Sequence, residues 1–345
     1  MRTGERFAGW IVRAMLVVAV AVCAGCGGSS APAAAGGGES DASARGERLV
    51  VLSPAVAVML RDLGLADLIV GKHDYDLVLP DSVPAVGHQE ALDYEGILSV
   101  EPTEVIIEWG SRPLPPTLET LATQHGWAVR RVTLLTIDDI AHTVDDLAIA
   151  YGVVDLGVER SDRPAGVPGP VPGVPRVMRF EDPAAKLEAT LPSATLARAW
   201  SVRGEGFGGV GPVLLLGSTT PPGVLGPGSF HDQILRRIGG TPAIEEGSPW
   251  MELDAEDVLR LDPAGIVLIS PRGVGTARAS VGEADLLARL GRLGDLDIRA
   301  VREGRVALID DPLALLPSTA MAGFADRLAA ILESWEEADE PGARP

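Results

Sequence analysis

Short apolar runs alternate along this chain with longer stretches of helical periodicity. The clearest case spans Val213 to Ile269, which holds an apolar run, a Gly/Pro loop opening a helix, a Trp-bearing loop, a second helix and another apolar run. The same order of elements recurs from Leu49 to Ile107. Alternating strands and helices are typical of largely parallel sheets, whose ligands bind at the carboxyl ends of the strands. The pattern predicts an α/β protein of two Rossmann-like lobes, with a ligand cleft between them.

A shorter repeat indicates that the two lobes are related. The segment EGILSVEP at 95–102 recurs as EDVLRLDP at 256–263, and each copy leads into an apolar strand. Glu, Leu and Pro stand at identical offsets in the two copies. An internal duplication of this kind fixes the architecture, so we expect matching helix-to-strand units in the two lobes.

The segment between the lobes is expected to be helical but interrupted. Apolar residues at helical spacing predict a helix over Ile137–Tyr151 and another over Ala184–Trp200. Between them the run RPAGVPGPVPGVP at 163–175 holds too many prolines for a helix or a central strand, because each removes a donor and fixes φ. Elsewhere Val83–Val86 predicts a third strand of the first lobe, and Ser53-Pro54 a helix start.

The N-terminus has the layout of a secretory signal. Three arginines precede an apolar run, AMLVVAVAVCAG, that is too short to span a bilayer comfortably. The small residues before Cys26 resemble the bacterial lipobox, which implies cleavage before Cys26 and lipid attachment to it; several acyl chains hold a protein stably on a membrane. An uncleaved membrane helix is the alternative. Because Cys23 and Cys26 are the only cysteines, no disulfide is expected in the folded part.

These patterns divide the chain into six segments. The expected boundaries are 1–26 for the signal peptide, 27–48 for a flexible tether, 49–135 for the N-terminal lobe, 136–211 for the helical connector with its Pro-rich insert at 161–175, 212–335 for the C-terminal lobe, and 336–345 for a disordered tail.

Composition narrows the function. The chain has 345 residues, 46% of them hydrophobic, which is enough for a core in each lobe. A formal net charge of -19 argues against a nucleic-acid partner, because a phosphate backbone selects basic surfaces. No Gly-x-Ser-x-Gly, His-Glu-x-x-His or phosphate-loop pattern occurs in the sequence, so no enzymatic activity is predicted.

The order and spacing of several segments resemble a known family, the bacterial solute-binding lipoproteins of helical-backbone class III type, which feed ABC importers for cobalamin, ferric siderophores and haem. The resemblance runs from about Leu49 to Glu333. The matching segments are Leu52-Ser-Pro, Gly64-Leu-Ala-Asp-Leu-Ile-Val-Gly71, Val86-Gly87, the Glu95 helix with Pro102, Gly226-Pro-Gly-Ser-Phe230, Ile238-Gly-Gly, Pro249-Trp250 and the Glu256 helix with Pro263.

This resemblance implies the partners and the location. The protein is expected to be the solute-binding component of an ABC importer, with a permease and its ATPase as partners and one exposed Glu on each lobe, Glu95 and Glu256, docking onto the permease. It is expected to be a monomer when free, lipid-anchored in the cell envelope and facing the periplasm or the extracellular side. No intrinsic cofactor is expected; the ligand is a cobalt- or iron-containing chelate, with a cobalamin-type corrinoid favoured over a ferric siderophore or haem.

The expected ligand contacts are flat or polar residues in loops that face the cleft. Trp109 and Trp250 are interpreted as matching positions in the two lobes, although core packing is the alternative for both. Pockets for large cofactors are mostly apolar with a few fixed polar groups. The candidate ligand-binding residues are Tyr75, His88, Gln89, Trp109, Phe230 and Trp250.

Three histidines raise a second possibility. His73, His88 and His231 lie on predicted loops or helix starts, and converging imidazoles can bind a transition metal, or one of them the metal of a chelate. The alternative function is therefore a zinc- or manganese-binding lipoprotein or a metal-delivery protein.

Overall fold

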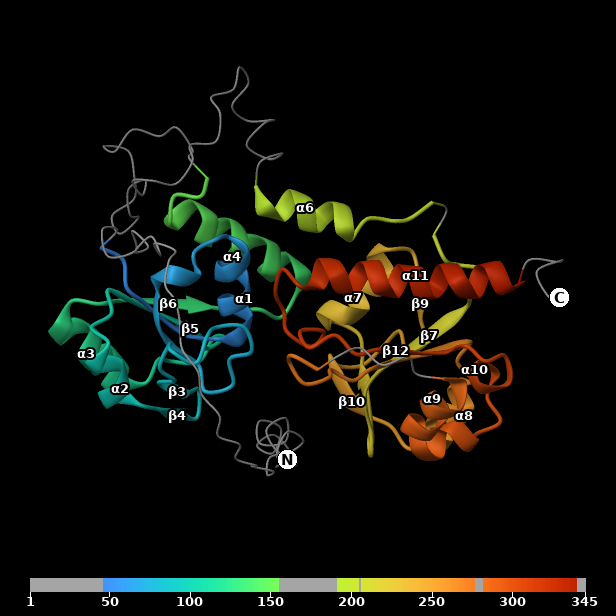
Figure 1. Cartoon of the computed structure of the whole chain (residues 1–345). Coiled ribbons are helices and arrows are strands. Elements are labelled where there is room, and N and C mark those ends of the chain that lie inside the picture. Colours follow the sequence, from blue (N-terminus) through green and yellow to red (C-terminus); the bar gives the residue numbers. More distant parts are fainter. Residues whose placement is uncertain (1–45, 155–190, 205, 277–281, 340–345) are drawn as a thin grey trace, which may run out of the picture. The chain divides into compact units, whose positions relative to one another are not determined.

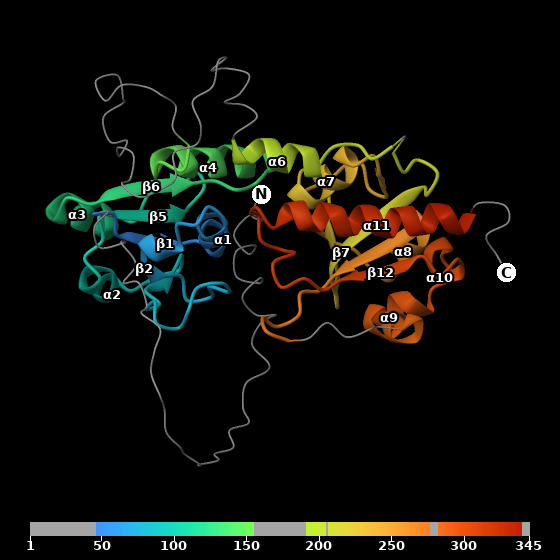
Figure 2. The ribbon, with the colours of Figure 1, turned by 45° about the horizontal axis from the view of Figure 1, so that its top comes forward.

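The computed structural model describes residues 46–154, 191–204, 206–276 and 282–339, which fold around two separate main sheets (Figures 1 and 2). Each sheet takes its strands from one half of the chain, so the predicted two-lobed α/β class is confirmed. The expected signal peptide with Cys26, nearly all of the tether and the Pro-rich insert lie outside the described residues. The proposed segment boundaries stay a prediction.

The first sheet has four parallel strands in the order β2-β1-β5-β6, with helices on both faces. Its central strand β1 is fully buried, because alternate residues pack against α1 and α4 on one face and α2 and α3 on the other. The elements are β1 (Leu49–Leu52), α1 (Pro54–Asp62), the 3-10 helix Ala66–Leu68, β2 (Ile69–Lys72), β3 (Gly87–His88), β4 (Ala91–Leu92), α2 (Tyr94–Ser99), β5 (Glu104–Glu108), α3 (Pro116–His125), β6 (Ala128–Val132) and α4 (Ile137–Ala150).

Two details of this half bear on the sequence predictions. Ser53 caps α1 as expected, since its Oγ accepts a hydrogen bond from the Val56 amide at 3.3 Å. The strand predicted over Val83–Val86 is wrong: Ala85 makes only an isolated bridge to Lys72, and pairing resumes at β3. Pro84 has no amide hydrogen to donate to a ladder, which explains the gap.

The second sheet is mixed. Its order is β10-β8-β7-β11-β12, with β9 beside β7; β7, β11 and β12 are parallel, whereas β8 and β10 run antiparallel to their neighbours. The elements are β7 (Pro212–Thr219), β8 (Pro222–Leu225), α7 (Phe230–Arg237), β9 (Thr241–Pro242), β10 (Trp250–Glu252), α8 (Ala255–Leu261), β11 (Gly265–Ile269), α9 (Glu283–Leu290), the 3-10 helix Gly291–Asp295, α10 (Arg299–Arg302), β12 (Val306–Ile309) and α11 (Met321–Asp339).

The antiparallel strands correct the simple strand-loop-helix interpretation of this half. The segment Pro221-Pro222-Gly223, expected in a loop, closes a hairpin between β7 and β8. Proline is tolerated there because it stands at the first residue of a strand. The hairpin places β8 between β7 and β10, so the Gly/Pro loop that opens α7 begins only after a further strand.

Helices α4, α6 (Pro192–Ala199) and α11 connect the halves. Helix α6 packs against both α4 and α11, and directly after it Trp200 is fully buried, with its Nε1–H donating to the Met321 carbonyl at 3.3 Å. At the start of α4, the Ile137 amide donates to Gln233 Oε1 on α7 at 3.1 Å. One hydrophobic core cluster therefore includes residues of both halves.

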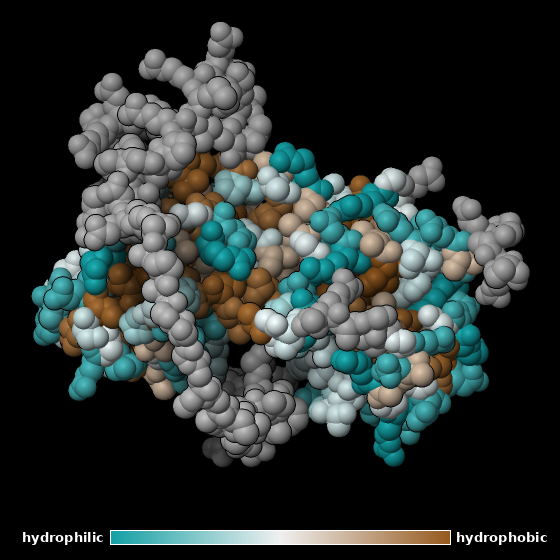
Figure 3. All heavy atoms as spheres, viewed as in Figure 1, coloured by the Kyte–Doolittle hydropathy of each residue, from teal (hydrophilic) through white to brown (hydrophobic). Residues whose placement is uncertain are grey.

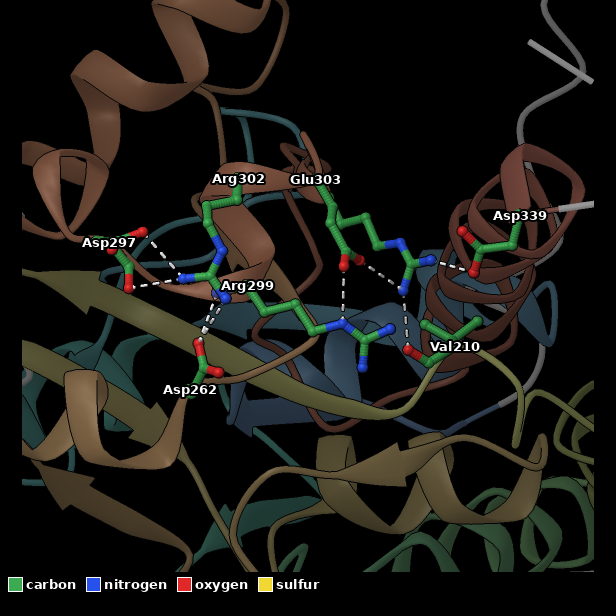
Figure 4. A network of polar contacts seen from close by, with 8 residues as sticks. Val210, Asp262, Asp297, Arg299, Arg302, Glu303 and Asp339 are labelled. Carbon is green, nitrogen blue, oxygen red and sulfur yellow. Dashed lines mark hydrogen bonds and ion pairs between the residues drawn. The ribbon is translucent and has the colours of Figure 1, made fainter.

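The closing helix extends further than the sequence predicts. Helix α11 runs to Asp339, whereas a disordered tail was expected from residue 336. The buried guanidinium of Arg305 pairs with Asp339, donates to the Val210 carbonyl at 3.0 Å and lies 3.3 Å from Glu303 (Figure 4). Trp335 packs closely on Gly265. These contacts explain why the last turns of the helix form.

Polar and apolar residues are distributed unevenly over the surface. On the face drawn in Figure 3, hydrophobic residues are visible in several patches over the first half, whereas hydrophilic residues are frequent around α8, α9 and α10. Within the described part of the chain, none of the helices combines the length and the apolar character needed to cross a bilayer.

Candidate functional site

The repeat found in the sequence is also a repeat in structure. Asp93 and Asp254 cap α2 and α8 by accepting hydrogen bonds from the amides three residues on, at 3.0 and 2.8 Å. After each helix comes a residue with positive φ, Glu101 at 44° and Asp262 at 42°, followed in each case by a proline. Each unit then enters a parallel strand, β5 or β11. The two halves thus carry equivalent helices, α2 and α8, in equivalent units.

Glu95 and Glu256 occupy the same position in these two units. Each is exposed and stands in the first turn of its helix, and the structure gives neither carboxylate a hydrogen bond or an ion pair within the described residues. The first turn of a helix is a favourable place for an acidic residue, and both carboxylates are available to a partner from outside the described residues. By contrast, the neighbouring Asp257 is engaged in the capping box of α8 and pairs with Arg260.

Four of the candidate site residues, together with Asp74, meet at the carboxyl end of the first sheet. We name these five residues the histidine cluster. They come from the loop after β2 and from β3 and the turn that follows it. The rings of His73, Tyr75 and His88 lie with their centroids 5.4 to 6.2 Å apart. The members are His73, Asp74, Tyr75, His88 and Gln89.

His73 is the buried member, and both of its ring nitrogens have partners. Nδ1 accepts from the Tyr75 amide at 3.1 Å, so Nε2 carries the hydrogen and donates to Gln89 Oε1 at 2.8 Å. Gln89 is held in that orientation because its Nε2 donates to the Leu52 carbonyl at 3.4 Å. Burial lowers the pKa of His73, partly offset by the Gln89 hydrogen bond. This imidazole is neutral and positions Gln89.

His88 is oriented differently and keeps one nitrogen free. Its Nδ1 lies 2.9 Å from Oδ2 of Asp74, whose Oδ1 accepts from the Gly87 amide at 3.0 Å. Since a carboxylate only accepts, Nδ1 donates, and the structure assigns Nε2 no partner within the described residues. A carboxylate that fixes an imidazole in this way also raises its basicity toward a metal. His88 is therefore the histidine best prepared to act as a donor.

The aromatic candidates of the first half differ in availability. Tyr75 is 45% exposed and presents its ring next to His88. Trp109 follows β5 and is half-buried: its Nε1–H donates to the Pro113 carbonyl at 2.7 Å, and the Arg112 guanidinium lies 4.3 Å from the ring centroid. Tyr75 thus offers a more open surface than Trp109.

The second half places Trp250 in a strand, not in the expected loop. Trp250 begins β10 opposite Leu225 and is 36% exposed, and its ring lies so close over Gly217 and Gly223 that a Cβ at either glycine would meet it at less than 3 Å. These glycines make room for the ring. Phe230, the first residue of α7, is half-buried with its centroid 4.2 Å from that of His231.

The proposed match between Trp109 and Trp250 is wrong. Trp109 follows a strand of the repeated unit, whereas Trp250 precedes its helix. In the spacing that relates Glu95 to Glu256, the counterpart of Trp250 is Gln89 and that of Trp109 is Ser270. Trp250 and Gln89 therefore stand at equivalent places, each shortly before the helix of its unit.

The structure does not bring the three histidines together. His231 is fully buried against Phe230 and Phe324, and its Nε2–H donates to the Ala314 carbonyl at 2.8 Å. Its Nδ1 is enclosed and has no partner among the residues that the structure describes. Among the described residues no group of three His, Cys, Asp or Glu side chains is placed to hold a metal ion. The expectation that His73, His88 and His231 converge on one metal ion is therefore wrong, because His231 faces the core.

Burial of His231 predicts a pH-dependent loss of stability. Desolvation lowers its pKa to about 4, against about 6.5 in an unfolded chain. Between these values the unfolded state binds more protons, so stability falls as the pH drops. From pH 7.5 to pH 5 this residue should remove about 2 kcal/mol of unfolding free energy. Urea unfolding at both pH values measures the change in unfolding free energy. This change should be smaller in His231→Gln than in wild type, and the same as wild type in His142→Gln, which replaces an exposed histidine. An equal change in wild type and both variants would contradict the prediction.

One residue of this edge was not predicted from the sequence. Glu108, the last residue of β5, is half-buried and accepts a hydrogen bond from the Ser53 hydroxyl at 2.7 Å. Burial raises the pKa of this carboxyl, with Ser53 opposing the shift. Its position at the carboxyl end of a central strand is the only sequence signal that could have singled it out.

Comparison with known proteins defines the class of fold. No family model and no curated protein sequence matches the chain. Solved structures do, and among them are periplasmic proteins named for binding vitamin B12 or heme.

Three of the similar structures illustrate this fold. The periplasmic vitamin B12 binding protein BtuF of Vibrio cholerae has 16% identity and a TM-score of 0.57, over 84% of this chain and 98% of that one. The periplasmic heme-binding protein HutB of Vibrio cholerae has 20% identity and a TM-score of 0.57, over 83% and 98%. The heme-binding protein RhuT from Roseiflexus sp. RS-1 has 21% identity and a TM-score of 0.54, over 84% and 98%. The resemblance expected from the sequence is thus confirmed at the level of the fold.

Proposed function

We propose that this chain is the solute-binding component of an ABC importer and delivers a metal-containing chelate to a membrane permease with its ATPase. The observation that carries this proposal is the pair of equivalent, exposed and unpaired carboxylates, Glu95 and Glu256. One carboxylate on each half suits charge-assisted docking onto arginines, which fixes orientation and register. A lipid anchor at Cys26 would hold the protein at the cell envelope, beside its permease.

A cobalamin-type corrinoid is the favoured cargo, ahead of a ferric siderophore and haem. The names of the similar structures, which bind vitamin B12 or heme, support a chelate as the ligand class. The histidine cluster supports it too, because Tyr75 offers a flat exposed ring and Gln89 a positioned amide beside it. Trp109, Phe230 and Trp250 complete the proposed contacts.

His88 is the proposed donor to the metal of the chelate. Its Nε2 has no partner among the described residues while Asp74 holds Nδ1, an arrangement that suits binding to a cobalt or iron ion with one exchangeable position. A chelate whose metal has no exchangeable coordination position cannot bind His88 through the metal and can use only the other contacts of the site. This difference gives a direct test of the assignment.

Visible titration of the whole protein with aquocobalamin and cyanocobalamin tests the proposal. Wild type should bind both corrinoids saturably. Only aquocobalamin should shift its visible absorption band, because its cobalt-bound water can be replaced by the imidazole of His88. His88→Ala should weaken aquocobalamin about tenfold or more while changing cyanocobalamin by less than about threefold. The matched control is His125→Ala, a histidine stacked on Trp127 at the end of α3.

The outcomes separate the claims. Equal losses for both corrinoids would show that His88 contacts the ligand without binding the metal. If wild type binds neither corrinoid, nor ferrioxamine, nor haemin, the chelate proposal fails, and zinc binding measured by calorimetry then decides whether the metal-binding alternative holds.

A further inference from the structure

Two glutamates at opposite ends of β5 have different surroundings. At the amino end, buried Glu104 accepts from Arg130 Nε at 2.6 Å through one oxygen and from the Tyr151 hydroxyl at 2.9 Å through the other. At the carboxyl end, Glu108 accepts only from Ser53 among the described residues, through Oε2. The same residue type on the same strand is thus fully paired at one end and half paired at the other.

A half-paired carboxylate in a half-buried position is costly. Charge removed from water needs partners, and desolvation raises the pKa of Glu108 despite the Ser53 hydrogen bond. Ser53 cannot provide more, since its fully buried hydroxyl donates its one hydrogen to Oε2 while accepting from the Val56 amide. The structure assigns Oε1 no donor within the described residues. A donor from outside the chain would reduce this cost.

Glu108 also borders the histidine cluster. Its partner Ser53 directly follows Leu52, whose carbonyl accepts from Gln89, and Gln89 in turn accepts from His73, so Glu108 and the histidine cluster are both anchored at the end of β1. The carboxyl ends of β1, β2 and β5 lie at one edge of the sheet, where ligands of α/β proteins bind. Oε1 is therefore at the edge where the proposed chelate would lie.

The cations at this edge already have partners. Lys72 Nζ donates to the carbonyls of Leu79 at 3.3 Å and Pro80 at 2.9 Å. Arg112 stacks on Trp109 and donates to its carbonyl at 3.4 Å. Neither cation contacts Glu108 among the described residues, so the Glu108 carboxylate opposes a ligand that carries carboxylates of its own.

We propose that Glu108 is a specificity-determining residue whose free Oε1 accepts a hydrogen bond from the chelate. It would select ligands that carry amide, hydroxyl or cationic donors and no net negative charge, over anionic chelates such as a porphyrin with two carboxylates. This inference rests on the proposed transport function and narrows its ligand class. Purely structural support of α1 through Ser53 is the competing role for the carboxylate.

Binding of three coloured probes to the whole protein tests the inference. Cyanocobalamin carries amides, ferrioxamine is a cationic ferric trihydroxamate, and haemin carries two carboxylates. Wild type should bind at least one of the first two about tenfold or more tighter than haemin. Glu108→Gln keeps an acceptor for Ser53 and should reduce that ratio about tenfold, because a charged acceptor is lost. Glu119→Gln removes an exposed carboxylate in the first turn of α3 and should leave the ratio unchanged.

Each result has a defined meaning. An unchanged ratio in Glu108→Gln, with or without a lower melting temperature, assigns the residue to structure and overturns the inference while transport stands. Tighter binding of haemin than of both other probes by wild type also overturns it. If wild type binds none of the three, the proposed function falls together with the role of Glu108.

Discussion

Reversing both exposed carboxylates, in the double variant Glu95→Lys and Glu256→Lys, is expected to reduce chelate uptake by cells about 100-fold. Each replacement puts a positive charge where the proposed permease presents arginines, so attraction is lost and repulsion added on both halves. The folded protein should tolerate the change, because both side chains are exposed and unpaired within the described residues. Uptake is measured with labelled cobalamin or iron chelate in cells that produce the protein and its transporter.

Affinity and a matched charge change provide the controls. The purified double variant should bind its chelate with unchanged affinity. Glu119→Lys reverses another exposed carboxylate, in the first turn of α3, and should leave uptake near the wild-type level. Either single reversal should give an intermediate loss, because docking uses two points. A loss of affinity as large as the loss of uptake would instead assign the carboxylates to the ligand.

The second large effect concerns the connection between the halves. Trp200→Ala is expected to lower the unfolding free energy by about 3–5 kcal/mol, since a fully buried indole is removed from the core shared by both halves. Its donation to the Met321 carbonyl is lost as well. Urea unfolding followed by circular dichroism measures the change.

A conservative replacement separates the two contributions. Trp200→Phe keeps most of the apolar contact but removes the Nε1–H donor, and should cost less than Trp200→Ala. An Ala variant that loses less than about 1 kcal/mol would contradict the packing assigned to this residue.

Much of the fold could be predicted because its parallel strands are continuous apolar runs. Leu49–Leu52 is buried on both faces, as such a run implies, and Ser53-Pro54 begins α1 as the capping chemistry predicts. The sequence does not predict the hairpin after β7, because Pro221-Pro222-Gly223 has the composition of a loop. The extension of α11 depends on Arg305, far from Asp339 in sequence, and no local pattern contains that information.

The candidate site was predictable only in outline. The loops that carry His73, Tyr75 and His88 follow strand ends, and strand order brings these residues together. Which nitrogen of each imidazole is free depends on partners such as Asp74 and Gln89, whose positions are set by strand pairing. The position of His231 at a helix start predicts an open side chain, whereas the α7 face that bears it packs into the core.

The common core of the two halves has a consequence for cooperativity. Trp200 and α11 lie in one hydrophobic cluster with α1 and α4 of the first half and α7 of the second. Neither half can separate from the other without exposing that cluster, so residues on both sides should melt in a single transition. A chelate that contacts only the first half would then raise the melting temperature of the second half by the same amount, through mass action on one shared equilibrium.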